Sequence, residues 1–336
     1  MTDLNTKLEI FDAIASRRNE RRNFLRFAGG SALAIGGATL LSACGSDDSD
    51  LAPTPTPGPA PVAALNDADV LNVALNLEYL EAQFYAFAAF GVGLNANMLT
   101  GIGTQGAVTG GAQVPFQDTV VREYAREIAI DEVAHVAFLR SALGSAAVAQ
   151  PAIDISVGTA AAPGAFTAAA RAAGVIGATG VFNPYADDNS FLLGAYIFED
   201  VGVSAYKGAA PLIANKTYLE AAAGILAAEA YHAGLIRTIL YRKGLQTPNP
   251  IPSLITAANQ ISDARDSLDG STDDDQGIAG PDATQSNIVP TDANALAYSR
   301  STGQVLNIVY LSKSALVGGG FFPNGVNGNI RTSAAS

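Results

Sequence analysis

Four stretches of the chain place apolar residues at helical spacing. Within each stretch the apolar side chains recur every three or four residues, which is the period of one face of an α-helix. The first begins at a capping Asn66 or Asp67 and ends at Gly91. The pattern therefore predicts an all-α domain with four long helices, over residues 66–90, 117–143, 189–208 and 216–243.

The connections between these helices are unequal in length. A glycine-rich loop, 91–115, joins the first two helices, whereas some 45 residues separate the second from the third. This long connection holds a short Ala-rich helical piece near 165–173 and one weak strand candidate, Ile153–Val157. A single long crossover of this kind can return the chain along a four-helix bundle. We expect the bundle domain to cover residues 64–245.

The last part of the chain, residues 246–336, is less regular. Its stretch 263–282 carries seven aspartates, but no Glu follows Glu229, so a calcium-binding loop is not supported and a solvated loop is expected. Residues 302–316 read as one more helix, and Gly318–Gly328 as a turn-rich closing segment. We expect this part to be an extra C-terminal segment that packs on the bundle.

Composition limits the classes of partner. Hydrophobic residues make up 49% of the chain and charged residues only 15%, so a large core can form. Beyond residue 43 there are 13 basic and 27 acidic residues, a net charge of -14. An acidic body of this kind argues against nucleic acid and anionic membrane surfaces as partners.

The N-terminal residues have the pattern of an export signal. Arg21 and Arg22 are followed by Phe24 and Leu25, which resembles the twin-arginine signal. The apolar run that follows, 27–43, has 17 residues and several glycines, whereas a membrane-spanning helix needs about 20 apolar residues. Residues 1–43 are therefore interpreted as a twin-arginine signal peptide.

The signal ends in Leu-Ser-Ala followed by the only cysteine, Cys44. This sequence resembles a bacterial lipobox, in which the cysteine is lipidated and becomes the first residue. The alternatives are cleavage without lipidation and retention as an uncleaved anchor. Residues 44–63 form a Pro-rich linker that would hold the body away from a membrane. We expect a periplasmic or cell-envelope lipoprotein, anchored in the membrane at Cys44.

The chain has two histidines, and each follows a glutamate by three residues. The pairs are Glu132 with His135 and Glu229 with His232. Residues at i and i+3 share one helix face, and here they interrupt otherwise apolar stripes. Burying their carboxylates without compensation would be very costly, so a positive charge is expected beside them.

The other two long helices carry a second repeated pattern. Glu78 and Tyr85 lie seven residues apart in the first helix, as do Glu199 and Tyr206 in the third. Seven residues are nearly two helical turns, so each pair follows one stripe. The two helical hairpins therefore resemble copies of one plan. Glu81 competes with Glu78 for the site, but Gly202 stands at the position that matches Glu81.

Together these helices offer four carboxylates and two imidazoles to one bundle core, which is the ligand set of a dimetal site. Oxygen and imidazole ligands suit two iron or manganese ions, whose charge would balance four carboxylates. The two tyrosines either hydrogen-bond the ligand carboxylates or simply pack in the core. Two further acids, Asp131 and Asp200, are expected on outer helix faces. The predicted metal ligands are Glu78, Glu132, His135, Glu199, Glu229 and His232.

Four segments of the chain resemble the exported ferritin-like domain proteins of bacteria, which are similar to the desiccation-related proteins of plants. They are LNLEYLEAQFY (75–85), DEVAHVAFLR (131–140), FEDVGVSAYKGAAPLI (198–213) and AAEAYHAGLIR (227–237). The resemblance implies a ferritin-like four-helix bundle, and the superfamily's metal ligands fall on the six residues above.

This resemblance implies no single activity. One hypothesis is a dimetal oxidoreductase or ferroxidase-like protein that acts on oxygen, peroxide or ferrous iron. A second is a non-enzymatic stress protein, related to desiccation tolerance, with structural or scavenged metal. A third, which the cost of burying the carboxylates disfavours, is an empty site retained only as a fold. The sequence leaves the oligomeric state open.

Overall fold

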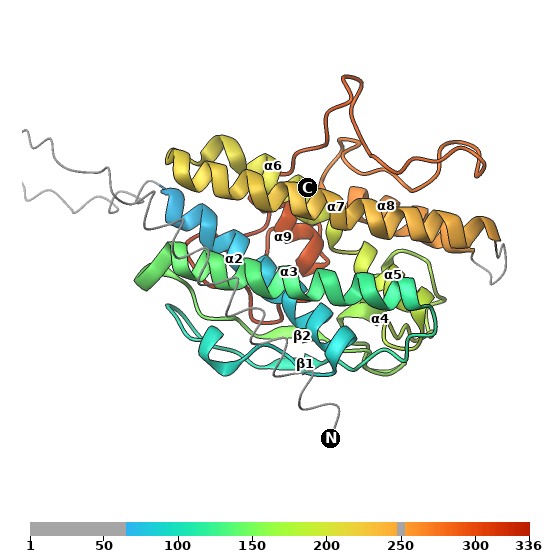
Figure 1. Cartoon of the computed structure of the whole chain (residues 1–336), viewed down its shortest axis with the longest axis horizontal. Coiled ribbons are helices and arrows are strands. Elements are labelled where there is room, and N and C mark those ends of the chain that lie inside the picture. The colour runs from blue at the N-terminus through green and yellow to red at the C-terminus, as the bar shows by residue number, and fades with distance from the viewer. Residues whose placement is uncertain (1–64, 247–252) are drawn as a thin grey trace, which may run out of the picture.

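The computed structural model describes residues 65–246 and 253–336. The predicted signal peptide, Cys44 and the predicted Pro-rich linker lie outside these residues. The predicted all-α class is confirmed, because helices dominate the described chain and strand is confined to two short segments (Figure 1). Within the described ranges, no helix has both the length and the apolar character required to cross a membrane.

Helix α2 (Asp67–Phe90) is the central element of the bundle. Asn66 caps it through a capping box with Asp69, and Gly91 ends it in a left-handed conformation with φ 71°. It packs along α3 (Thr119–Leu143) and also contacts α6 (Glu199–Ala209). Because neighbours cover it on nearly every side, most of its residues are buried, polar ones included.

The third predicted helix, 189–208, is two helices in the structure. Helix α5 (Asp188–Tyr196) stops, and α6 starts three residues later at Glu199. Neither Pro nor Gly occurs between 195 and 201, so the local sequence does not explain the interruption. The amides of Ile197 and Phe198 still donate to carbonyls three residues earlier, whereas the Tyr196 carbonyl accepts from the Arg265 side chain. Helix α7 (Lys216–Gln246) then completes the bundle.

The crossover between α3 and α5 carries strand β2 (Ile153–Ile155) and helix α4 (Ala165–Ala172). The strand lies within the predicted candidate. It pairs in parallel with β1 (Val108–Gly110), with Val108 opposite Ile153. No sequence pattern predicted β1, which lies in the glycine-rich loop between α2 and α3. Short 3-10 turns occur at Ala96–Met98, Gly144–Ala146 and Ala210–Leu212.

The aspartate-rich stretch is only in part the solvated loop that was expected, because Asp263, Asp273 and Asp282 are exposed whereas Asp269 and Asp275 are buried. Its first part belongs to helix α8 (Leu254–Asp269), and Asp269 and Asp275 are only 2% and 7% exposed. Both carboxylates pair with buried arginines, Arg265 and Arg300. Asp269 pairs with Arg300, and Asp275 pairs with both arginines. Since Arg300 is 25 or more residues away in the chain and Arg265 is ten residues before Asp275, aspartate content alone could not reveal the pairing.

Helix α9 (Thr302–Tyr310) is shorter than the predicted 302–316. Leu311 adopts a left-handed backbone with φ 55°, which ends the helix. Beyond it, Leu316 exchanges hydrogen bonds with Ser333 of the chain end. The closing segment also enters the core, because the Phe321 ring lies 4.9 Å from that of Phe198, between centroids. The C-terminal segment is thus packed on the bundle (Figure 1).

Candidate metal centre

The structure brings all six predicted metal ligands together inside the bundle. Each of the four long helical segments contributes: α2 and α6 one glutamate each, α3 and α7 one Glu-x-x-His pair each. All six side chains are buried, and Glu132 and Glu229 are fully so. Their ligand atoms form two overlapping groups in which the atoms lie within 4.8 Å of one another. One group holds Glu78, Glu132, His135 and Glu229, and the other Glu199, Glu229 and His232.

Two carboxylates lie between the halves of the cluster. Glu229 belongs to both groups. Glu132 places Oε2 3.5 Å from Nδ1 of His135 and Oε1 3.1 Å from Nδ1 of His232. Glu78 and Glu199 lie at the two outer positions, with Oε2 atoms 3.2 Å from Nδ1 of His135 and 3.7 Å from Nδ1 of His232. This arrangement fits two cations held side by side.

Eight candidate ligand atoms in this cluster are buried and form no hydrogen bond within the described residues, although each histidine Nδ1 lies within ion-pair distance of a carboxylate oxygen. They are Glu78 Oε2, both oxygens of Glu132, Glu199 Oε2, both oxygens of Glu229, and Nδ1 of His135 and His232. Buried polar atoms are almost always satisfied, and unpartnered ones indicate an ion or water. Carboxylate oxygens and imidazole nitrogens converging on one volume are donors for iron or manganese, so the residues present fit a dimetal centre.

The two tyrosines hold the outer carboxylates in a reciprocal way. Tyr85 of α2 donates its hydroxyl hydrogen bond to Oε1 of Glu199 on α6. Tyr206 of α6 donates in return to Oε1 of Glu78 on α2. In each glutamate one oxygen is therefore fixed, and the other points at a histidine. Of the two roles open to the tyrosines, hydrogen bonding to the glutamates is the one the structure shows.

Burial and mutual repulsion keep protons on this cluster in the absence of cations. Burial raises the pKa of Glu78 to about 7 and that of Glu199 to about 8, and raises the pKa of Glu229 well above its usual value. Although burial opposes it, the carboxylates of Asp131, Glu132 and Glu199 raise the pKa of His232 to about 10. Cations that bind here would have to displace these protons.

Glu81, the alternative to Glu78, is also buried but lies outside both ligand groups. It faces the side of the cluster where α6 has Gly202. A Cβ at Gly202 would lie 2.5 Å from Oε2 of Glu229 and 3.7 Å from Oε1 of Glu81. The missing side chain therefore leaves room beside the shared ligand Glu229. A small, mainly apolar cavity begins here, with Leu77 and Phe198 in its wall.

We expect Gly202→Ala to weaken metal binding about tenfold, because the added methyl group would displace the Glu229 carboxylate. Metal titration followed by elemental analysis measures the effect. Gly234→Ala on α7 is the matched control, since a Cβ there meets nothing within 4 Å. Equal metal affinity in both variants would contradict the crowding at Gly202.

The two aspartates expected on outer faces have partners. Asp131 is partly exposed, yet its Oδ2 lies 3.4 Å from Nε2 of His232, where it can orient the imidazole. The expectation for Asp200 is wrong: it is buried and pairs with Arg237 and Arg265. Neither arginine is near Asp200 in the sequence, so no local sequence pattern could predict the pairing.

A helical bundle whose core gathers these carboxylates and imidazoles is typical of ferritin-like architecture, and its residues are compatible with a metal centre. Residues 66–242 match the family model for the ferritin-like domain, and the chain belongs to that family.

Two relatives cover most of the chain. It is 28% identical over 271 residues to Ferritin-like catalase Nec2 of Nesocodon mauritianus. The aligned region covers 79% of this chain and 84% of the relative. It is 29% identical over 248 residues to Desiccation-related protein PCC13-62 of Craterostigma plantagineum, covering 72% and 76%. The predicted similarity to plant desiccation-related proteins is confirmed.

Proposed function

We propose that the chain holds two iron or manganese ions and uses them to convert hydrogen peroxide to oxygen and water. The observation that carries the proposal is the set of eight unpartnered ligand atoms at the centre of the bundle. The relative named a ferritin-like catalase supports this choice among the reactions open to a dimetal centre.

A bound pair of such ions can exchange two electrons with a small oxygen substrate. In the reaction one peroxide molecule is oxidised to oxygen while a second is reduced to two water molecules. The chain would supply the surroundings: Glu132 and Glu229, which lie near both histidines or belong to both ligand groups, could be shared between the ions, and the tyrosines fix Glu78 and Glu199. The cavity beside Gly202 is lined by apolar residues and by Glu81, which suits a small neutral substrate better than an anion.

The metal content of the purified protein tests the binding, and an oxygen electrode tests the reaction. We expect two iron or manganese ions per chain and one oxygen molecule released for every two peroxide molecules consumed. Activity should follow metal content across preparations that are partly depleted and reloaded. Metal-loaded protein that leaves peroxide unchanged would rule out the catalytic part of the proposal.

A second candidate function is a non-enzymatic role in stress, with metal that is structural or scavenged. The relative named a desiccation-related protein favours it. The two candidates differ in a simple respect, because only the first requires peroxide to be turned over. Metal-loaded protein that binds its ions tightly, without peroxide or ferrous iron oxidation, would support this second role.

We also propose that the chain is exported by the twin-arginine route and anchored by a lipid at Cys44. The support is the sequence alone: paired Arg21 and Arg22, an apolar run, and the only cysteine at its end. We expect Cys44→Ala to move the protein from the membrane fraction to the soluble fraction, measured by fractionation of cells. Mass spectrometry of the wild-type N-terminus checks the lipid directly, and an unmodified Cys44 would contradict the anchor.

A further inference from the structure

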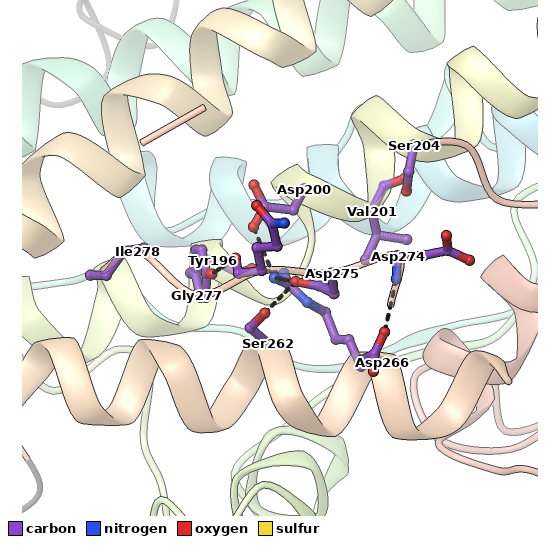
Figure 2. Close-up of polar contacts among 12 residues, drawn as sticks. Tyr196, Asp200, Val201, Ser204, Ser262, Asp266, Asp274, Asp275, Gly277 and Ile278 are labelled. Atoms are coloured by element: carbon purple, nitrogen blue, oxygen red, sulfur yellow. Dashed lines mark hydrogen bonds and ion pairs between the residues drawn. The ribbon is translucent and has the colours of Figure 1, made fainter. Parts of the chain in front are cut away.

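A second buried polar cluster adjoins the metal centre on the side of α6. It pairs three arginines with three aspartates, and all six are at most 8% exposed. Figure 2 shows Asp200, Ser262 and Asp275 gathered between α6 and α8. The charges balance within the cluster, so it needs no additional ion. Its charged members are Asp200, Arg237, Arg265, Asp269, Asp275 and Arg300.

Arg265 of α8 spans the interruption between α5 and α6. One guanidinium nitrogen donates to the carbonyl oxygen of Tyr196, the last residue of α5. The other donates to Oδ2 of Asp200, in the first turn of α6, at 2.8 Å. The guanidinium carbon also lies 4.5 Å from the centroid of the Tyr196 ring. In an uninterrupted helix the Tyr196 carbonyl would accept from the amide of residue 200, so Arg265 takes the place of that amide.

The candidate metal ligand Glu199 lies between the two residues that Arg265 contacts. It is the first residue of α6, between Tyr196 and Asp200, and it has Oε2 3.7 Å from Nδ1 of His232. The direction in which Glu199 points depends on where α6 starts and how it is rotated. No Pro or Gly imposes the interruption. Arg265 bonds both of its ends, and Arg237 also contacts both, through the Tyr196 hydroxyl and Asp200.

Arg237 strengthens the same arrangement from α7. It lies five residues after His232 and donates to Oδ2 of Asp200 at 2.7 Å. Its other nitrogen donates to the carbonyls of Gly277 and Asn287, both at 2.6 Å. The segment that follows α8 is thereby tied to the helix that carries one Glu-x-x-His pair.

We propose that Arg265 is a positioning residue for Glu199. It holds the α5–α6 interruption so that the Glu199 carboxylate meets His232 and Glu229. The C-terminal segment then contributes to the metal site, since its residue Arg265 aligns one of the ligands. This inference rests on the proposed binding of two metal ions.

The test uses the full chain loaded with Co²⁺, whose visible absorption reports ligand number and geometry. Lysine at 265 keeps the charge, but its single ammonium group cannot serve the Tyr196 carbonyl, Asp200 and Asp275 together. We expect Arg265→Lys to keep the first Co²⁺, bind the second at least about tenfold more weakly and show an altered absorption band.

Arg300→Lys is the matched control. Arg300 belongs to the same cluster and is equally buried, but its side chain bonds Ser204, Asp269 and Asp275 and none of the residues 196–200. We expect it to bind two Co²⁺ ions with the wild-type spectrum, even if its melting temperature falls. Identical Co²⁺ binding and spectra in Arg265→Lys and wild type would overturn the proposal, as would an equal change in both variants.

The outcomes separate this inference from the proposed function. Wild-type protein that fails to bind two metal ions refutes the proposed function itself. If Arg265→Lys does not fold, Asp200→Asn decides, because it keeps the size of the side chain and weakens the contact on the α6 side. A wild-type Co²⁺ spectrum in that folded variant would overturn the positioning role.

Discussion

Glu132→Gln is expected to reduce metal binding from two ions per chain to one at most. Glu132 is fully buried, and its two oxygens face the two histidines separately, at 3.5 and 3.1 Å. The amide keeps the shape but offers one neutral oxygen in place of two charged ones. One ion position therefore loses this donor, and the other keeps only a weaker, neutral one. We expect at least about a hundredfold weaker binding of the remaining ion and loss of peroxide turnover, measured by metal titration and an oxygen electrode.

Glu127→Gln provides the control for this change. It lies on the same helix, α3, and its side chain is exposed, so it removes one negative charge without touching the centre. This variant should keep both ions and the wild-type activity. Two tightly bound ions in Glu132→Gln would show that the carboxylate is no ligand, and the proposed centre would need a different set of residues.

The parts of the fold that follow from local periodicity were predictable. The ends of α2, α3 and α7 agree with the predicted ranges within three residues, because apolar spacing and capping residues are local signals. The ligand set was accessible for a related reason. A glutamate and a histidine three residues apart must share a helix face, and the repeat between hairpins favoured Glu78 over Glu81.

What could not be predicted depends on contacts between distant residues. The interruption after Tyr196 coincides with a hydrogen bond from Arg265, 69 residues later. Likewise, the burial of Asp269 and Asp275 depends on pairing with Arg300, and for Asp275 also with Arg265, which no local pattern predicts. A charge run has no intrinsic location, and only the three-dimensional arrangement decides whether it is solvated or paired.

The acidic cluster also predicts how the stability of the metal-free protein depends on pH. The folded-state pKa values of Glu78 and Glu199, about 7 and 8, lie above the usual 4.5, and that of His232, about 10, lies above 6.5. For each group, the native state therefore binds more protons than the unfolded chain at any pH between the usual pKa and the folded-state pKa. Stability must then fall as pH rises, from about pH 5 for the glutamates and from about pH 6.5 for the histidine.

We expect the melting temperature of metal-free protein to fall by at least about 5 °C between pH 5 and pH 9. Protein saturated with Mn²⁺ should lose much less, because the cations replace the protons and stabilise the ionised carboxylates. The stabilisation by Mn²⁺ therefore grows with pH. Calorimetry of both forms measures it, and metal-free Glu199→Gln, which removes one titrating group, should show a flatter dependence. A metal-free protein equally stable at pH 5 and pH 9 would mean that the six side chains do not share one buried volume.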